Sequence, residues 1–192
     1  MHNQKCIIKK TMKAMKKYLL AGVAFVAALV TDAQTLNVTV GNVTYLFPSA
    51  STGDMTYSGG TTLTIMGKTF NLSDITSMNV NESTVTNNLV TVEYSGTTAK
   101  VTVAGNVAQY VSPTVSGAHV SVAQSNTAAV DGDEITYRLS GTTTDGEFNM
   151  TSGSYKCTLS LNGLTLTNPS GAAITVTNGK RIQLSAKDGT TN

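Results

Sequence analysis

The sequence predicts an all-β fold, and three observations support this prediction. The chain is rich in Val and Thr, whose branched side chains fit a pleated strand better than a helix. Apolar and polar residues alternate, as at Leu36, Val38 and Val40. The alternating runs end at turn-forming residues such as Gly41-Asn42. After residue 33 no segment shows a convincing 3.6-residue apolar period, so we expect strands joined by short turns.

Residues 1–33 have the pattern of a secretory signal peptide. Six lysines precede a short apolar run at residues 18–30, and Thr31 and Ala33 then provide the small residues of a cleavage site. A buried helix or a membrane anchor is the alternative, but the run is too short to span a bilayer comfortably. We therefore expect cleavage after Ala33, a secreted or cell-surface location, and no membrane span in the processed protein.

The net charge of the processed chain differs from that of the whole chain. The full sequence carries a formal charge of +2, but removal of residues 1–33 leaves seven basic residues against ten acidic ones. The positive charge therefore belongs to the export signal. No basic stripe with interleaved aromatic residues remains, which argues against nucleic acid as a partner.

The alternating segments divide into two predicted modules. Residues 34–117 contain several hairpin patterns and predict a small antiparallel β module. In residues 118–192 the alternating runs end in Gly or Asn-Gly at close but irregular spacing, which suits a parallel β-solenoid made of stacked turns. From the pattern alone, a β-sandwich fits this second segment about as well.

Three pieces of the second module resemble a known family. They are LSGTTTDG at residues 139–146, the pattern L-x-L-N-G-L-x-L-T-N-P-x-G-x-A-I at residues 159–174, and NGKRI followed by DGTTN. In this order they resemble the start of secreted bacterial proteins with a carbohydrate-binding domain. The resemblance implies the first turns of a right-handed parallel β-helix, truncated at Asn192. It also implies calcium ions, and a polysaccharide or cell-surface glycan as partner, without catalysis.

Tyrosines are the candidate sugar-contacting residues, because the chain has no Trp. Tyr137 and Tyr155 lie within the segment of resemblance, and Tyr110 precedes it. Each ring could stack on a pyranose. Each could instead be a packing residue, which is the more common role of a tyrosine at strand spacing.

Asp131, Asp133 and Glu134 are the candidate calcium ligands. They bring three carboxylates into one turn-like break, and calcium requires six to eight oxygen ligands. The segment lacks the EF-hand pattern. A solvated turn before the strand that begins near Ile135 is the alternative interpretation.

No catalytic residues are predicted. His119 is the only histidine after residue 33, and Cys157 alternates in phase with Leu159 as a buried strand residue would. Asp145 and Glu147 fit a glycosidase acid/base pair only weakly, because the sequence indicates no pocket around them. A structural or adhesive surface protein is the alternative to glycan binding. A polysaccharide lyase fits less well, because the basic residues are scattered.

Overall fold

The computed structural model describes residues 34–151, 155–177 and 179–192, all of which belong to one compact unit. The predicted signal peptide and its cleavage after Ala33 lie outside these residues. The all-β prediction is confirmed: the described residues form fifteen strands and two short 3-10 turns, η1 (Ser49–Ser51) and η2 (Gly105–Val107). Across the same residues, no helix has the length and apolar character needed to cross a membrane.

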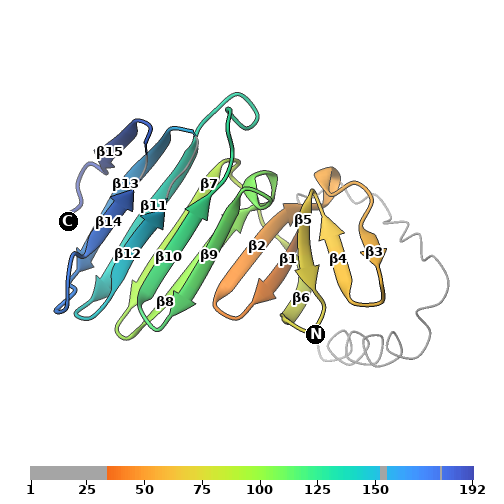
Figure 1. Ribbon diagram of the computed structural model, residues 1–192, viewed down its shortest axis with the longest axis horizontal. Coiled ribbons are helices and arrows are strands. Elements are labelled where there is room, and N and C mark those ends of the chain that lie inside the picture. Colours follow the sequence, from red (N-terminus) through yellow and green to blue (C-terminus); the bar gives the residue numbers. More distant parts are fainter. Residues whose placement is uncertain (1–33, 152–154, 178) are drawn as a thin grey trace. The chain divides into compact units, whose positions relative to one another are not determined.

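Eight strands form one large sheet, here called the main sheet (Figure 1). Both of its ends are edge strands from distant parts of the chain. In spatial order the strands are β15 (Ile182–Ala186), β13 (Cys157–Leu166), β11 (Ile135–Thr143), β7 (Leu89–Ser95), β8 (Thr98–Ala104), β2 (Val43–Pro48), β1 (Gln34–Val40) and β6 (Ile75–Glu82).

Two smaller sheets complete the fold. The second sheet has the order β14 (Ile174–Thr177), β12 (Glu147–Thr151), β10 (His119–Gln124) and β9 (Val111–Ser116). The third sheet is formed by β3 (Thr56–Ser58), β4 (Thr62–Ile65) and β5 (Lys68–Asn71).

Parallel and antiparallel pairs are mixed in the main and second sheets. The neighbours β1/β2, β7/β8 and β9/β10 are antiparallel, because turns of two residues join them. From β10 onward, successive strands alternate between the second and main sheets. The resulting parallel pairs are β10/β12 and β12/β14 in the second sheet, and β11/β13 and β13/β15 in the main sheet.

The right-handed parallel β-helix expected from the resemblance is therefore not shown. The two sheets that contain residues 118–192 are mixed, because they also hold the antiparallel pairs β9/β10 and β7/β8. In addition, β2 pairs in parallel with β8 inside the segment predicted to be antiparallel. The predicted module boundary at 117/118 falls in the β9/β10 turn, where Gly117 has a φ of 61°. Strands from both predicted modules share the main sheet, since β7 pairs with β11.

The core lies on one face of the main sheet. Tyr45, Val103, Val90 and Tyr137 are register partners on consecutive strands and so share this face. At one end of the row, the ring of Tyr45 packs edge-on against Phe70 of the third sheet, with a centroid distance of 5.1 Å. At the other end, Tyr137 packs against Phe148 of the second sheet at 6.1 Å. Both smaller sheets therefore cover the same face.

Two buried tyrosine hydroxyls join the main and second sheets. The hydroxyl of Tyr94 donates a hydrogen bond to the backbone oxygen of Glu147, at 2.9 Å. The hydroxyl of Tyr137 donates to Oε1 of Gln124, also at 2.9 Å. Each bond satisfies a polar group that would be costly to bury alone, and each fixes the position of one sheet on the other.

Because of these buried tyrosines, we expect the free energy of unfolding to decrease at alkaline pH. Burial raises the pKa of Tyr45 to about 12, and it also raises the pKa values of Tyr94 and Tyr137. The folded protein thus keeps these phenols protonated at pH values where the unfolded chain, with a tyrosine pKa of about 10, has released its protons. Their contribution is complete below pH 10 and decreases as the pH rises from there toward 12, by up to about 1.4 kcal/mol per pH unit for each group.

The measurement is urea unfolding at a series of alkaline pH values, with tyrosinate absorbance followed in parallel. Tyr45→Phe removes one of the three groups, so its stability should decrease less steeply with pH than that of the wild-type protein. Stability that stays constant while all tyrosines ionise near pH 10 would contradict the assignment.

Candidate functional site

The outer face of the main sheet carries a continuous row of polar side chains. Strand register places one residue of each strand in this row, here called the Arg138 row. Seven of the eight residues bear hydroxyl groups. In spatial order from β6 to β15 they are Ser77, Thr39, Thr44, Thr102, Thr91, Arg138, Ser160 and Ser185.

The geometry of the row follows from the strands beneath it. Neighbouring strands of a sheet lie about 4.8 Å apart, so the row repeats a polar group at that interval. None of its eight residues is buried. The hydroxyl oxygens of Thr39 and Thr44 lie 3.1 Å apart and share a hydrogen bond, which shows that neighbouring members can form a ladder.

Arg138 is the only charged member of the row. It is exposed at the middle of β11, between Thr91 on β7 and Ser160 on β13. By strand register, the acidic residue nearest to Arg138 is Glu93. It lies in the next row of the outer face, opposite Lys100. Within the described ranges, Arg138 forms no ion pair. Its guanidinium therefore presents unused hydrogen-bond donors among the hydroxyl groups.

Next to the Arg138 row, a second polar row continues the outer face on three strands. It consists of Thr136, Thr158 and Gln183, which are register partners. Glu134 borders this row: its Oε1 accepts a hydrogen bond from the hydroxyl of Thr158 at 2.6 Å. Its Oε2 lies 2.6 Å from Nη2 of Arg181, in an ion pair. Glu134, just before β11, is thus connected to β13 and to the residue that precedes β15.

The structure separates the predicted tyrosine candidates. Tyr137 has no exposed surface, so its ring packs between the sheets and has no face open to a ligand. Tyr155 is partly exposed, and Nζ of Lys156 lies 5.7 Å from its ring centroid. Tyr110 is half-buried against the core. Tyr155 lines a shallow hollow of about 370 Å³ that also includes basic side chains of Lys156, Lys180 and Arg181.

The candidate calcium ligands do not converge on one point. Asp131 accepts a hydrogen bond from Nδ2 of Asn106 at 2.8 Å, and Asp133 accepts one from the backbone N–H of Glu134 at 2.9 Å. Glu134 is bound to Thr158 and Arg181, as described above. No cluster of three His, Cys, Asp or Glu side chains suited to a metal ion occurs in the described chain. As arranged, these three carboxylates do not fit a calcium site, and calcium dependence stays a prediction.

One cluster that the sequence did not indicate surrounds His119. Nε2 of His119 lies 3.5 Å from a carboxylate oxygen of Asp145, and Nδ1 lies 3.8 Å from one of Glu147. Asn168 donates a hydrogen bond to the other Glu147 oxygen at 3.2 Å. The parallel register of β10 and β12 places His119 opposite Glu147, a pairing that local pattern cannot predict. The two imidazole nitrogens face different carboxylates, so they do not share one metal position.

Cys157 is buried, as its alternation with Leu159 predicts. Its sulfur lies 3.9 Å from the sulfur of Met150 on the second sheet. It is therefore a residue of the core between the sheets, where it has no access to solvent for a role as nucleophile.

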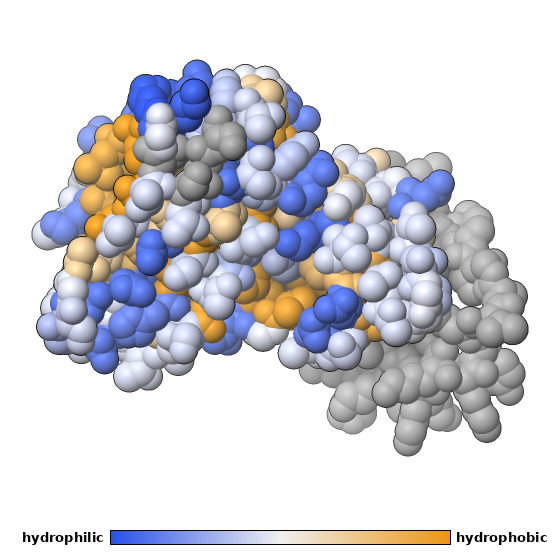
Figure 2. Space-filling view, in the orientation of Figure 1, coloured by the Kyte–Doolittle hydropathy of each residue, from blue (hydrophilic) through white to orange (hydrophobic). Residues whose placement is uncertain are grey.

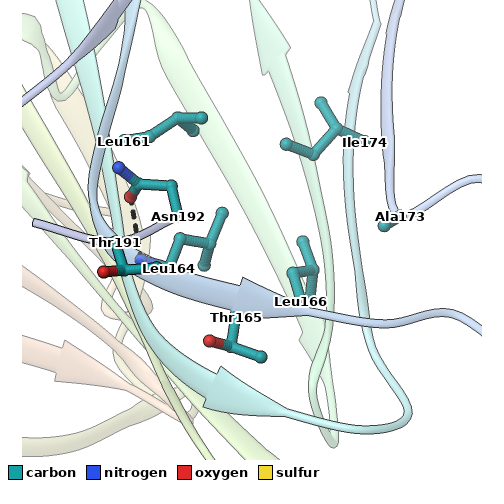
Figure 3. A pocket seen from close by; sticks show the side chains of 8 residues that line it. All are labelled: Leu161, Leu164, Thr165, Leu166, Ala173, Ile174, Thr191 and Asn192. Atoms are coloured by element: carbon teal, nitrogen blue, oxygen red, sulfur yellow. Dashed lines mark hydrogen bonds between the residues drawn. The ribbon is translucent and has the colours of Figure 1, made fainter.

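An apolar hollow of about 410 Å³ lies between β13 and the segment that leads into β14 (Figure 3). It is lined mainly by aliphatic side chains, among them Leu161, Leu164, Leu166 and Ile174. Oδ1 of Asn192 accepts a hydrogen bond from the backbone N–H of Leu164 at 3.0 Å. In Figure 2, hydrophobic colour gathers at the margin where β14 and β15 lie, and Leu184 of β15 is 66% exposed. The lining offers neither aromatic rings nor charged groups to a sugar.

A comparison with known proteins matches part of this all-β chain to a protein family. Residues 116–192 match the family model described as carbohydrate-binding domain-containing protein. The matched segment begins at the end of β9 and includes β10 to β15, and with them three members of the Arg138 row. Searches of curated proteins and of solved structures found no match to the chain.

Proposed function

We propose that this protein is an exported, non-catalytic protein that binds a polysaccharide or a cell-surface glycan. The observation that carries the proposal is the match of residues 116–192 to the carbohydrate-binding family model. Export is supported by the lysine-rich, then apolar, start of the sequence. Calcium dependence is supported only by the family resemblance of residues 139–192, and the chelator experiment below tests it.

The geometry of the described residues supports binding rather than catalysis. A glycosidase needs two carboxylates on either side of a scissile bond, in a site that holds the sugar. Asp145 and Glu147 instead flank the partly exposed His119, and neither lines the hollow beside Tyr155 or the apolar hollow beside β13. An exposed face rich in hydroxyl groups suits many weak polar contacts with a long ligand.

The test is retention of the purified chain on a panel of insoluble polysaccharides, including cellulose and pectin, with and without a chelator. We expect retention on at least one glycan, and elution by the chelator if calcium takes part. No retention on any glycan, together with adhesion to cells or proteins, would contradict the proposal in favour of an adhesive role. Release of unsaturated uronides from pectin would contradict the non-catalytic part.

A further inference from the structure

We propose that a linear glycan lies across the strands of the main sheet, along the Arg138 row, with Arg138 as its central contact. The proposed binding stretch covers five adjacent strands, β8, β7, β11, β13 and β15. Its contact residues are Thr102, Thr91, Arg138, Ser160 and Ser185. This inference rests on the proposed function and adds to it a surface, a direction and a set of residues.

The spacing of the strands is similar to the repeat of hydroxyl groups along a linear polysaccharide. Five strands span four intervals, so the stretch is about 19 Å long at the usual strand spacing of about 4.8 Å. A linear polysaccharide that crosses the strands presents hydroxyl groups at a similar interval along its own length. Each strand can then contribute one hydroxyl or guanidinium contact. Contacts that are weak singly add up when one continuous chain makes them all.

Arg138 has hydrogen-bond donors that the described residues leave unused. A guanidinium has five N–H donors in a planar fork, which suits paired oxygen acceptors. Arg138 stands exposed between Thr91 and Ser160 without an ion pair in the described part of the chain. Two sugar hydroxyl oxygens, or one uronate carboxylate, would satisfy the same fork. The shared chemistry is a pair of oxygen acceptors on a sugar chain.

The inner face of the main sheet and the hollow beside β13 are less suited to a glycan than the outer face. The inner face of the main sheet is closed by the smaller sheets, and the hollow beside β13 is lined mainly by aliphatic side chains. The family match independently indicates a carbohydrate ligand for the segment that contains Arg138, Ser160 and Ser185. Register then extends the same row to Thr91 and Thr102, which lie before the matched residues. The site therefore crosses the limit of the matched segment.

The experiment uses the full chain and a glycan on which the wild-type protein is retained. Affinity is measured for Arg138→Gln, Thr91→Val and Ser160→Ala. Because hydrogen bonds to charged groups contribute more than neutral ones, Arg138→Gln should weaken binding about tenfold or more. Thr91→Val and Ser160→Ala should each weaken it by about two- to fivefold. Soluble oligosaccharides should bind more tightly as they lengthen to the span of the row.

Two control variants match the changes in chemistry but lie outside the Arg138 row. Lys187→Gln removes one positive charge beyond the end of β15, and Thr69→Val removes an exposed hydroxyl on the third sheet. Both should bind as the wild-type protein does. Urea unfolding of every variant shows whether the fold is intact. Neutral and uronate-containing oligosaccharides distinguish the two sources of acceptor oxygens for Arg138.

The outcomes separate this inference from the proposed function. If the wild-type protein binds a glycan and the three row variants bind equally well, the row is not the site and the inference is overturned alone. The same holds if Lys187→Gln weakens binding as much as Arg138→Gln, because net charge then explains the effect. If the wild-type protein binds no glycan, the proposed function fails and the inference fails with it.

Discussion

Gly141→Ala should destabilise the protein by more than about 4 kcal/mol, which is exceptional for a single methyl group. Gly141 lies in β11 at a bulge, with a φ of 89°, opposite Tyr94 of β7. A Cβ at this position would overlap the backbone oxygen of Tyr94 and lie 3.0 Å from its carbonyl carbon. Both obstacles are backbone atoms of a central strand, so neither can move without disturbing the main sheet. The measurement is the free energy of unfolding in urea.

Gly163→Ala is the matched control. Gly163 also has a positive φ, of 67°, but no heavy atom lies within 4 Å of the Cβ position. Its substitution should therefore cost only the left-handed backbone penalty, about 1–2 kcal/mol. If the two variants lose equal stability, the close approach between β11 and β7 is not what requires glycine at residue 141.

Tyr137→Ala should cost about 3–5 kcal/mol, because it empties the site of the largest fully buried side chain in the described core. Tyr137→Phe should cost about 1–3 kcal/mol, because it keeps the ring but removes the hydrogen bond to the buried Gln124. Both values are measurable by urea unfolding. Tyr57→Ala, at a position that is 40% exposed on the third sheet, should change stability by less than about 0.5 kcal/mol.

The same pair of variants distinguishes packing from sugar stacking. Because the ring of Tyr137 has no exposed surface, Tyr137→Ala and Tyr137→Phe should both leave glycan retention unchanged at temperatures where the variant is folded. A Tyr137→Ala variant that is fully folded but no longer retained on the glycan, while Tyr137→Phe is retained, would show that the ring reaches the ligand.

The sequence predicted the strands well because their cause is local. Alternation placed Leu36, Val38 and Val40 on one face of a strand, and Leu36 and Val38 are buried while Val40, at the end of the strand, is partly buried. The hairpin at Gly41-Asn42 follows from turn chemistry in the same way. These features depend on residues a few positions apart, so a single sequence contains what determines them.

Pairing between distant strands was not predictable from these patterns. Alternation fixes which face of a strand is buried, but it does not say which strand lies beside it. The parallel pairing of β2 with β8, and of β7 with β11, joins segments that only tertiary packing brings together. For this reason the sequence suggested two modules, the second a parallel solenoid or a sandwich, whereas strands of both share one mixed main sheet.

The candidate site illustrates the same limit. Tyr137 was selected for its ring, but its strand phase is that of Ile135 and Leu139, which face the core. Asp131, Asp133 and Glu134 are adjacent in sequence, yet they bind different partners. The Arg138 row was not recognised because its members come from eight strands along almost the whole described chain. One local feature did indicate the outer position of Arg138. It directly follows Tyr137 in the strand, and consecutive side chains of a strand point to opposite faces.

Arg138 and Tyr137 are consecutive in the chain but face opposite sides of the main sheet. One side chain stabilises the layered interior, while the next is available to the surroundings. Substitutions at Arg138, Ser160 or Ser185 can therefore change the chemistry of the outer face without removing interior volume. In such a framework the chemistry of the outer face and the packing of the interior can be changed independently of each other.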